Sequence, residues 1–384
     1  MKVQGMKRLG TAMAGLAMLA LTGCAGFFVS TSSTSTSTTA TAGDYVYALN
    51  PTTSTLSAYT VGSGTLTAIS GSPYTLASTV APLSVCVSGL NTIVYVGGTG
   101  GIYGYLIGTN GALTQISSGA ALATAAVARI ACSPDGNWLV ALDSANAQVD
   151  EYQIATSTGL LTSVSSVAYS YTSGLTPSLA SIRFSPLAGY VIAALGNAGT
   201  AVYTFNTSTG ALASAYTINP STTTINHNAV TVNSTDTMLY IAESGSSAGV
   251  LTYTLGTTTV SGSTTPVAAG TAPYSVELSK TNGFLYVGNY GTASTGTPGS
   301  ISQYSFENSV PTALSPASVS SSGYVVTMAR DNSGSYLLAG LGGVTTDLVM
   351  YDFSSSTTGT LVSTASQATS SANTGAGLQI ATTH

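Results

Sequence analysis

The amino-acid sequence predicts an all-β protein, a seven-bladed β-propeller with four antiparallel strands in each blade and a ring closed by its C-terminal strand. Three observations lead to this prediction: the composition, a repeat that occurs seven times, and turn residues at fixed places in that repeat. Of the 384 residues, 44% are hydrophobic, 5% are charged and 43 are glycine. Low charge with high hydrophobicity excludes a disordered chain, and the abundance of Gly, Ser and Thr disfavours long helices.

A short strand of β-branched and aromatic residues recurs with a mean period of about 48 residues. Its seven copies are residues 45–48, 93–96, 138–141, 190–193, 239–242, 285–288 and 336–339. A period of this length is typical of propeller blades. Seven copies therefore predict seven blades.

A second strand follows each first one, and it carries a tyrosine at the same place in every repeat. The seven tyrosines are Tyr59, Tyr105, Tyr152, Tyr203, Tyr253, Tyr304 and Tyr351. Apolar and polar residues alternate around them, which indicates a half-buried strand. Because every repeat has this tyrosine, we expect it to pack between neighbouring blades rather than to form a cofactor site.

A tight turn beginning with glycine ends this second strand in most repeats. The glycines are Gly64, Gly111, Gly159, Gly210 and Gly359, each followed two residues later by leucine. Glycine supplies the positive φ that such hairpins need. A further strand precedes the first one, as at residues 82–88 and 273–279, so each repeat holds about four strands.

The first repeat lacks this leading strand, because Asp44 runs directly into the strand at residues 45–48. The segment at residues 377–381 has the missing alternation of apolar and polar residues. We expect it to complete the first blade and to close the ring. Closure removes an exposed sheet edge, which would otherwise favour aggregation.

The N-terminus has the pattern of a signal peptide. Lys2, Lys7 and Arg8 precede an apolar stretch at residues 9–21 that is too short for a comfortable membrane span. The following Leu-Thr-Gly-Cys, which ends at Cys24, resembles the bacterial lipobox, whose cysteine is lipidated and becomes the new N-terminus. A plain secretory peptide is the alternative.

We therefore expect a signal peptide at residues 1–23, a lipidated Cys24 with a Ser/Thr-rich tether at 24–43, and the propeller at 44–384. Several acyl chains on Cys24 would hold the protein stably on a membrane. The expected location is the cell envelope after export, at the outer membrane. The lipid anchor makes the membrane one expected partner.

The distribution of charge excludes nucleic acid as a partner. The chain has seven Lys and Arg and twelve Asp and Glu, and three of the seven cations lie in the first eight residues. Removing that end leaves four cations against twelve acids, a net charge of −8. Nucleic-acid binding needs a cationic surface that this chain lacks. A small molecule, a glycan or a protein at one mouth of the ring is the expected partner.

Three arginines, Arg129, Arg183 and Arg330, lie beyond the N-terminal segment. Arg129 and Arg183 fall in leading strands, which line the central channel of a propeller. Arginine binds carboxylates well, so these two are ligand-binding candidates. The alternative is that each pairs with a nearby acid such as Asp135.

The repeat as a whole resembles the lactonase-type seven-bladed β-propellers, a family with YVTN-like repeats. The features that carry the resemblance are a Tyr-Val-Ala-Asn-like strand, a Tyr-centred strand and a Thr-Gly-x-Leu-Thr turn, over about residues 44–384. The family includes 6-phosphogluconolactonase and carboxymuconate-cyclising enzymes, together with many exported propellers. The resemblance thus implies the same fold and, in enzymatic members, hydrolysis of a lactone or cyclisation of carboxymuconate.

In enzymatic members, a Pro-Arg-His motif leads one inner strand and an Asn-Glu pair follows the next. The nearest match here is His227-Asn228-Ala229, followed by Glu243, so the family arginine is absent. The resemblance implies His227 and Glu243 as catalytic candidates and Asn228 and Asn289 as ligand-binding candidates. The alternative is that Glu243 is a polar rim residue and His227 an ordinary residue at the start of a strand.

Cys86 and Cys132 remain after lipidation, and their neighbours alternate as in buried strands. This predicts unreactive core thiols, with a disulfide between adjacent blades as the alternative. The sequence has no paired histidines and no His-Glu-x-x-His motif, so we expect neither a metal nor a cofactor.

Three functional hypotheses follow. The preferred one is a surface-displayed propeller that binds a ligand or partner and whose catalytic residues are degenerate. The second is a lactone-hydrolysing enzyme, and the third is a structural or adhesive envelope protein. For 6-phosphogluconolactone the case is weak, because its phosphate needs cations that are scarce here.

Overall fold

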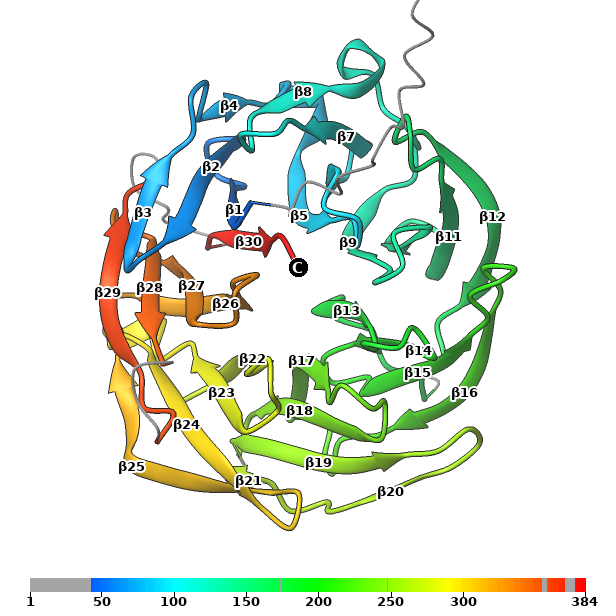
Figure 1. The fold of residues 1–384 in the computed structure, drawn as a ribbon. Coiled ribbons are helices and arrows are strands. Elements are labelled where there is room, and N and C mark those ends of the chain that lie inside the picture. The colour runs from blue at the N-terminus through cyan, green and yellow to red at the C-terminus, as the bar shows by residue number, and fades with distance from the viewer. Residues whose placement is uncertain (1–42, 173, 247, 354–357, 370–376) are drawn as a thin grey trace, which may run out of the picture. The chain divides into compact units, whose positions relative to one another are not determined.

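The computed structural model describes residues 43–384 apart from 173, 247, 354–357 and 370–376 (Figure 1). The predicted signal peptide, the lipobox with Cys24 and the tether up to residue 42 lie outside the described residues and stay predictions. Among the described residues, no helix has the length and apolar character needed to cross a membrane. Their secondary structure is β-strand, apart from three short 3₁₀ helices at Ser78–Val80, Ile116–Gly119 and Ala293–Thr295.

The strands form seven antiparallel sheets that follow one another around a central channel, which confirms the predicted propeller (Figure 1). From the channel outward, blade 1 is β30 (Gln379–Thr382), β1 (Tyr45–Asn50), β2 (Thr55–Gly62) and β3 (Thr65–Ala68), with β4 (Tyr74–Thr75) also paired to β2. Blade 2 is β5 (Pro82–Val87), β6 (Ile93–Gly98), β7 (Gly101–Ile107) and β8 (Leu113–Gln115), and blade 3 is β9 (Val127–Cys132), β10 (Trp138–Asp143), β11 (Gln148–Ile154) and β12 (Leu161–Ala168).

The other four blades repeat this order. Blade 4 is β13 (Ser181–Phe184), β14 (Tyr190–Ala194), β15 (Thr200–Phe205) and β16 (Leu212–Ile218). Blade 5 is β17 (Asn226–Val232), β18 (Met238–Ser244), β19 (Gly249–Leu255) and β20 (Val260–Gly262), with β21 (Val267–Ala268) also paired to β19. Blade 6 is β22 (Pro273–Leu278), β23 (Phe284–Asn289), β24 (Ser300–Glu307) and β25 (Val310–Ser320), and blade 7 is β26 (Tyr324–Arg330), β27 (Tyr336–Gly342), β28 (Leu348–Asp352) and β29 (Val362–Gln367).

The C-terminal strand closes the ring as predicted. Strand β30 pairs antiparallel with β1, with Val46 opposite Thr382 and Leu49 opposite Gln379. Beyond the strand, the hydroxyl of Thr383 accepts a hydrogen bond from the Tyr45 amide at 2.9 Å. On its other side, Thr382 donates to the carbonyl of Arg330 in blade 7 at 2.7 Å. Blade 1 is thus built from both ends of the described chain and is attached to blade 7.

The hydrophobic core is divided into seven clusters, and each cluster lies between two adjacent blades. Each contains one of the seven repeated tyrosines; Tyr59, for example, packs with Val46 of its own blade and Leu338 of blade 7. Burial raises the pKa of all seven phenols, which keeps them uncharged. The predicted role of these tyrosines in packing between blades is confirmed.

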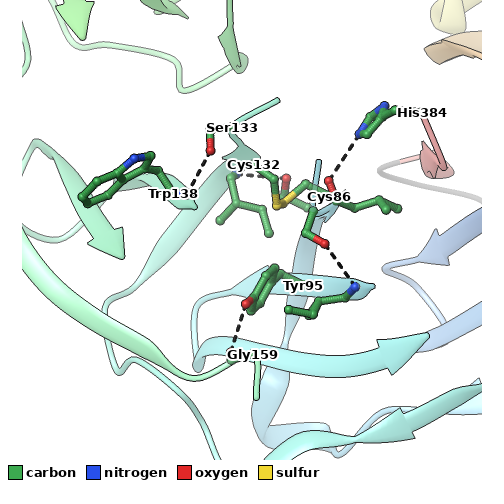
Figure 2. Close-up of a disulfide and its surroundings, with 12 residues drawn as sticks. Cys86, Tyr95, Cys132, Ser133, Trp138, Gly159 and His384 are labelled. Atoms are coloured by element: carbon green, nitrogen blue, oxygen red, sulfur yellow. Dashed lines mark hydrogen bonds between the residues drawn. A yellow bond between two sulfur atoms is a disulfide. The ribbon is translucent and has the colours of Figure 1, made fainter. Parts of the chain in front are cut away.

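Glycine turns of blades 2, 3 and 7 accept a hydrogen bond from a tyrosine of the blade before. The phenol of Tyr95 on β6 donates to the carbonyl of Gly159 in blade 3 at 2.9 Å (Figure 2). Tyr47 makes the same bond to Gly111 at 2.9 Å. Gly159 has a φ of +75°, and a Cβ there would lie 2.3 Å from the side chain of Ile116. The glycine is therefore required both by the turn and by the close approach of the neighbouring blade.

A disulfide joins Cys86 on β5 to Cys132 on β9, the inner strands of blades 2 and 3 (Figure 2). The prediction of two free core thiols is therefore wrong, and the alternative of a disulfide between adjacent blades is correct. The two cysteines are 46 residues apart, about one repeat, so they occupy similar places in neighbouring blades. Their Cα atoms are 6.0 Å apart, within the usual range for a disulfide. Alternation along one strand shows which face is buried, but not what lies opposite in the next blade.

Removing the closing strand tests how far the fold depends on it. Deleting residues 377–384 exposes the edge of β1 and the apolar surface that Leu378 and Ile380 cover. We expect a lower Tm and concentration-dependent aggregation, measured by calorimetry and light scattering. Deleting His384 alone leaves the strand pairing intact and serves as the control. A truncated protein as soluble and as heat-stable as the parent would contradict closure by β30.

Candidate functional site

The central channel contains a cavity of about 430 Å³. Its walls come from the innermost strand of every blade, namely β5, β9, β13, β17, β22, β26 and β30, which surround the middle of the ring in Figure 1. Apolar residues contribute to the wall together with polar ones, and they include Val85, Ile130, Val230, Val276 and Met328, whose side chains also belong to the clusters between the blades. Cavities of this size and character are typical of small-molecule sites.

Five of the inner strands have a β-bulge near their start, where one residue is skipped in the pairing with the next strand. The skipped residues are Leu83, Ala128, Asn228, Tyr274 and Val326. A bulge redirects side chains relative to the regular ladder. Asn228, Tyr274 and Val326 line the cavity. Asn228 therefore faces the channel, while His227 beside it remains within the sheet register.

All three arginines beyond the N-terminal segment line this single cavity. Arg129 on β9 donates from Nε to the carbonyl of Ala180 at 2.8 Å and from Nη1 to that of Ala128 at 2.8 Å. Within the described part of the chain, its Nη2 has no hydrogen-bond acceptor and its guanidinium has no carboxylate partner. Burial lowers the pKa of Arg129, and the phenol of Tyr274 partly offsets this effect.

Arg183 on β13 reaches two other blades. Its Nη2 lies 2.6 Å from Oε2 of Glu277 on β22, and its Nη1 donates to the hydroxyl of Thr231 at 3.0 Å. The prediction that an arginine pairs with an acid is thus correct for Arg183, but the partner is not Asp135. That carboxylate instead accepts a hydrogen bond from Ser133 of its own turn at 2.5 Å. The Glu277 partner lies two blades away, so sequence proximity could not identify it.

Arg330 and His384 also line the cavity, although neither was predicted to contribute to a site. Arg330 ends β26, and His384 follows β30, so that the C-terminus lies at the middle of the ring (Figure 1). His384 is exposed at the mouth, with Nε2 3.4 Å from the carbonyl of Val87. The surrounding channel wall nevertheless desolvates its imidazole enough to lower the pKa, and Arg330 adds to the effect. The predicted closure by the last strand was the signal that could have placed His384 here.

The two catalytic candidates, His227 and Glu243, contact each other, but they do so inside the channel wall and not in the cavity. His227 on β17 is paired with Glu243 on β18, and Nε2 lies 3.4 Å from Oε2. The other ring nitrogen of His227 is 2.9 Å from the hydroxyl of Thr200 in blade 4. The exposed fractions of His227 and Glu243 are 0% and 2%. The pair is therefore closed to solvent between blades 4 and 5, and the arginines line the channel instead.

The two asparagine candidates differ in position. Asn228 donates from Nδ2 to the hydroxyl of Ser244 at 2.8 Å and to the carbonyl of Pro273 at 2.7 Å, which leaves Oδ1 available to a ligand. Asn289 is fully buried, and its Nδ2 donates to Ser300 and Ser302 at 3.0 Å each. Asn228 can thus contact a ligand in the cavity, whereas Asn289 holds the strands of blade 6 together.

The cavity is more cationic than the rest of the protein. Three arginines line it, and Glu277 is the one acid among the described residues of its wall. A cleft with one sign of charge and low-dielectric walls concentrates ions of the opposite sign. Among the residues that the structure describes, no three His, Cys, Asp or Glu side chains are grouped so as to hold a metal ion. The arrangement is therefore suited to an anion with an apolar body.

Neither a family model nor a curated protein matches this chain. Its fold is that of lactonase-like propellers. A 6-phosphogluconolactonase candidate from Bacteroides uniformis has 13% identity and a TM-score of 0.68, with 88% of this chain and 99% of that one covered. A second such candidate, from Bacteroides fragilis, has 14% identity and a TM-score of 0.63, covering 84% and 94%.

A periplasmic gluconolactonase from Pseudomonas aeruginosa has 15% identity and a TM-score of 0.62, with 88% of this chain and 98% of that one covered. At such identities the likeness establishes the fold and not the activity. The predicted resemblance to lactonase-type propellers is therefore confirmed for the fold.

Proposed function

We propose that this protein is an exported envelope lipoprotein whose central channel binds a small organic anion without catalysing a reaction. The observation that carries the proposal is the placement of the arginines. Of the four cations beyond residue 8, three line the same cavity. In a chain with twelve acidic residues, such a concentration of positive charge favours a negatively charged ligand.

Arg129 provides the main attachment point for the anion. Its hydrogen bonds to the carbonyls of Ala180 and Ala128 fix the guanidinium but leave its charge uncompensated. A partly buried charge without a counterion costs free energy, which a bound carboxylate would recover through a charge-assisted hydrogen bond. Asn228 Oδ1 is available to a ligand that carries a hydrogen-bond donor as well as the carboxylate. The apolar wall would cover the rest of the molecule.

The buried state of His227 and Glu243 supports binding without catalysis. A general acid or base must come within hydrogen-bond reach of the reacting group. With exposed fractions of 0% and 2%, these two side chains cannot contact a molecule in the cavity unless the wall moves. The family arginine is also missing from the matched position.

Two features support the envelope location. The N-terminal segment has the charge pattern, the apolar stretch and the Cys24 motif of a lipoprotein signal. The disulfide between Cys86 and Cys132 suits an oxidising compartment outside the cytoplasm. Lipid on Cys24 would anchor the protein at the membrane, and the outer membrane is our proposed destination.

Replacing Arg129 tests the proposed site. We expect calorimetry at low ionic strength to detect binding of at least one acid from a panel of acetate, gluconate and benzoate. Arg129→Gln should weaken this binding by about tenfold or more, because a hydrogen bond to a charged group contributes about 1.5–3 kcal/mol. Lys280→Gln is the matched control, since Lys280 bonds to the Asn332 carbonyl and lies outside the cavity wall. Equal losses in both variants would contradict the proposal, and no binding to the parent would favour the structural or adhesive role.

Replacing Cys24 tests the proposed anchor. The parent should fractionate with membranes, and Cys24→Ala should release the protein into the soluble envelope fraction, because the lipid supplies the attachment. Ala25→Ser serves as a control that keeps the cysteine. Unchanged membrane retention of Cys24→Ala would exclude lipidation as the anchor.

Lactone hydrolysis is the second candidate function. The names of the structural neighbours and the 3.4 Å contact between His227 and Glu243 favour it. Hydrolysis needs a group that polarises the carbonyl and another that transfers protons. Here polarisation would come from Arg129, Arg183 or backbone amides, and the wall between blades 4 and 5 would have to open.

A lactone panel separates the two functions. We expect no appreciable turnover of 6-phosphogluconolactone and at most weak hydrolysis of uncharged lactones. Robust hydrolysis abolished by Glu243→Gln, in a variant with unchanged circular dichroism, would make the protein an enzyme and reverse our ranking. Robust hydrolysis that survives both Glu243→Gln and His227→Ala would also establish an enzyme, but with catalytic residues elsewhere.

A further inference from the structure

Three tyrosines from blades 6 and 7 form an aromatic stack beside the channel. The rings of Tyr290 and Tyr324 are 4.8 Å apart between centroids and 11° from parallel. The ring of Tyr274 lies 5.4 Å from that of Tyr290 at 45°. We call Tyr274, Tyr290 and Tyr324 the tyrosine stack. Tyr274 is its member that lines the cavity.

The fold does not require this stack. The seven repeated tyrosines are buried between blades, whereas all three members of the stack are half-buried. Tyr274 occupies a bulge position that other blades fill with Leu83, Ala128, Asn228 or Val326. Within the described residues, the three phenol oxygens have no hydrogen-bond partner, and none of them is a fully buried atom, so they are open to solvent or to a ligand. These features indicate a surface available for a ligand.

Tyr274 is held next to the proposed anion site. The carbonyl of Pro273, which precedes it, accepts a hydrogen bond from Nδ2 of Asn228 at 2.7 Å. This bond fixes the bulge of β22 to that of β17. Arg129 lines the same cavity, and its pKa responds to the Tyr274 phenol. The cavity therefore combines a cation without a carboxylate partner, an amide oxygen and an aromatic ring.

The side-chain hydroxyls of the wall are either hydrogen-bonded within the protein or closed off by burial. Ser84 accepts a hydrogen bond from the Ile130 amide at 3.1 Å, and Thr327 donates to the carbonyl of Leu378 at 2.9 Å. Thr382 donates to the Arg330 carbonyl at 2.7 Å. The hydroxyls of Ser181 and Ser275 have no hydrogen-bond partner within the described residues, but both oxygens are fully buried and so closed to a ligand. A sugar acid would bring several hydroxyls into this cavity and leave many of them unpaired, which is costly. A flat acid with an apolar body has no such cost.

From this geometry we infer that the channel selects a planar aromatic carboxylate. Its ring would extend the tyrosine stack on the channel side of Tyr274, while its carboxylate would accept hydrogen bonds from Arg129. The inference rests on the proposed anion-binding function and adds the chemical class of the ligand. A cavity of about 430 Å³ has room for an acid of one or two rings.

The test compares benzoate with cyclohexanecarboxylate, which has the same charge and number of carbons but a puckered, saturated ring. A purely apolar pocket would bind the saturated acid at least as tightly, because it buries at least as much apolar surface. We expect calorimetry to show benzoate binding about three to ten times more tightly. Tyr274→Leu should abolish this preference, whereas Tyr274→Phe should retain it. In NMR spectra, the ring protons of benzoate should shift upfield with the parent and with Tyr274→Phe.

The outcomes separate the two proposals. Equal affinities for the two acids, or a preference that survives in folded Tyr274→Leu, would overturn the inference about the aromatic ligand. If binding in that case still depends on Arg129, the anion-binding function stands. If the parent binds neither acid nor any other anion of the panel, both proposals fail. Should Tyr274→Leu not fold, the affinity ratio and upfield shifts with the parent and Tyr274→Phe decide the inference.

Discussion

Burial of apolar surface between neighbouring blades is the constraint on which the rest of this structure depends. Each sheet has two faces, and each face is covered only by the adjacent blade, so no blade can bury its core alone. The repeated tyrosines fill these interfaces, and the glycine turns let a carbonyl of one blade reach the phenol of the blade before it. The ring must therefore close, and β30 supplies the last inner strand.

This closure also creates the candidate site. Seven inner strands around one axis place residues from distant parts of the chain on a common wall. Arg183 and Glu277, for example, are 94 positions apart in the sequence. In three of the inner strands, a bulge also brings the skipped residue, Asn228, Tyr274 or Val326, to the wall of the channel. In β17 the bulge directs Asn228 to the cavity, while His227 stays in the ladder and is buried against blade 4. The same local irregularity thus removes the histidine from the site and provides the amide.

The repeats made most of the fold predictable, because burial of a strand face and positive φ leave local signals in the sequence. The period, the repeated tyrosines, the turn glycines and the closing segment were all readable in this way. The site was only partly readable. Arg129 and Arg183 could be assigned to the channel from their strands, but the Cys86–Cys132 bond and the Glu277 partner depend on which residues of different blades face each other. A bulge shifts the pairing of two strands by one residue. The bulges in β17 and β22 left no local signal in the sequence.

The bulge positions have a consequence for how such a protein changes over time. The five of them hold leucine, alanine, asparagine, tyrosine and valine, yet the ladders on both sides continue undisturbed. Side chains at these positions are excluded from the regular pairing, and at the half-buried Asn228 and Tyr274 a substitution alters the lining of the channel without breaking a ladder pair. A propeller of this kind can therefore acquire a new ligand specificity one blade at a time, through single substitutions that natural selection can test separately.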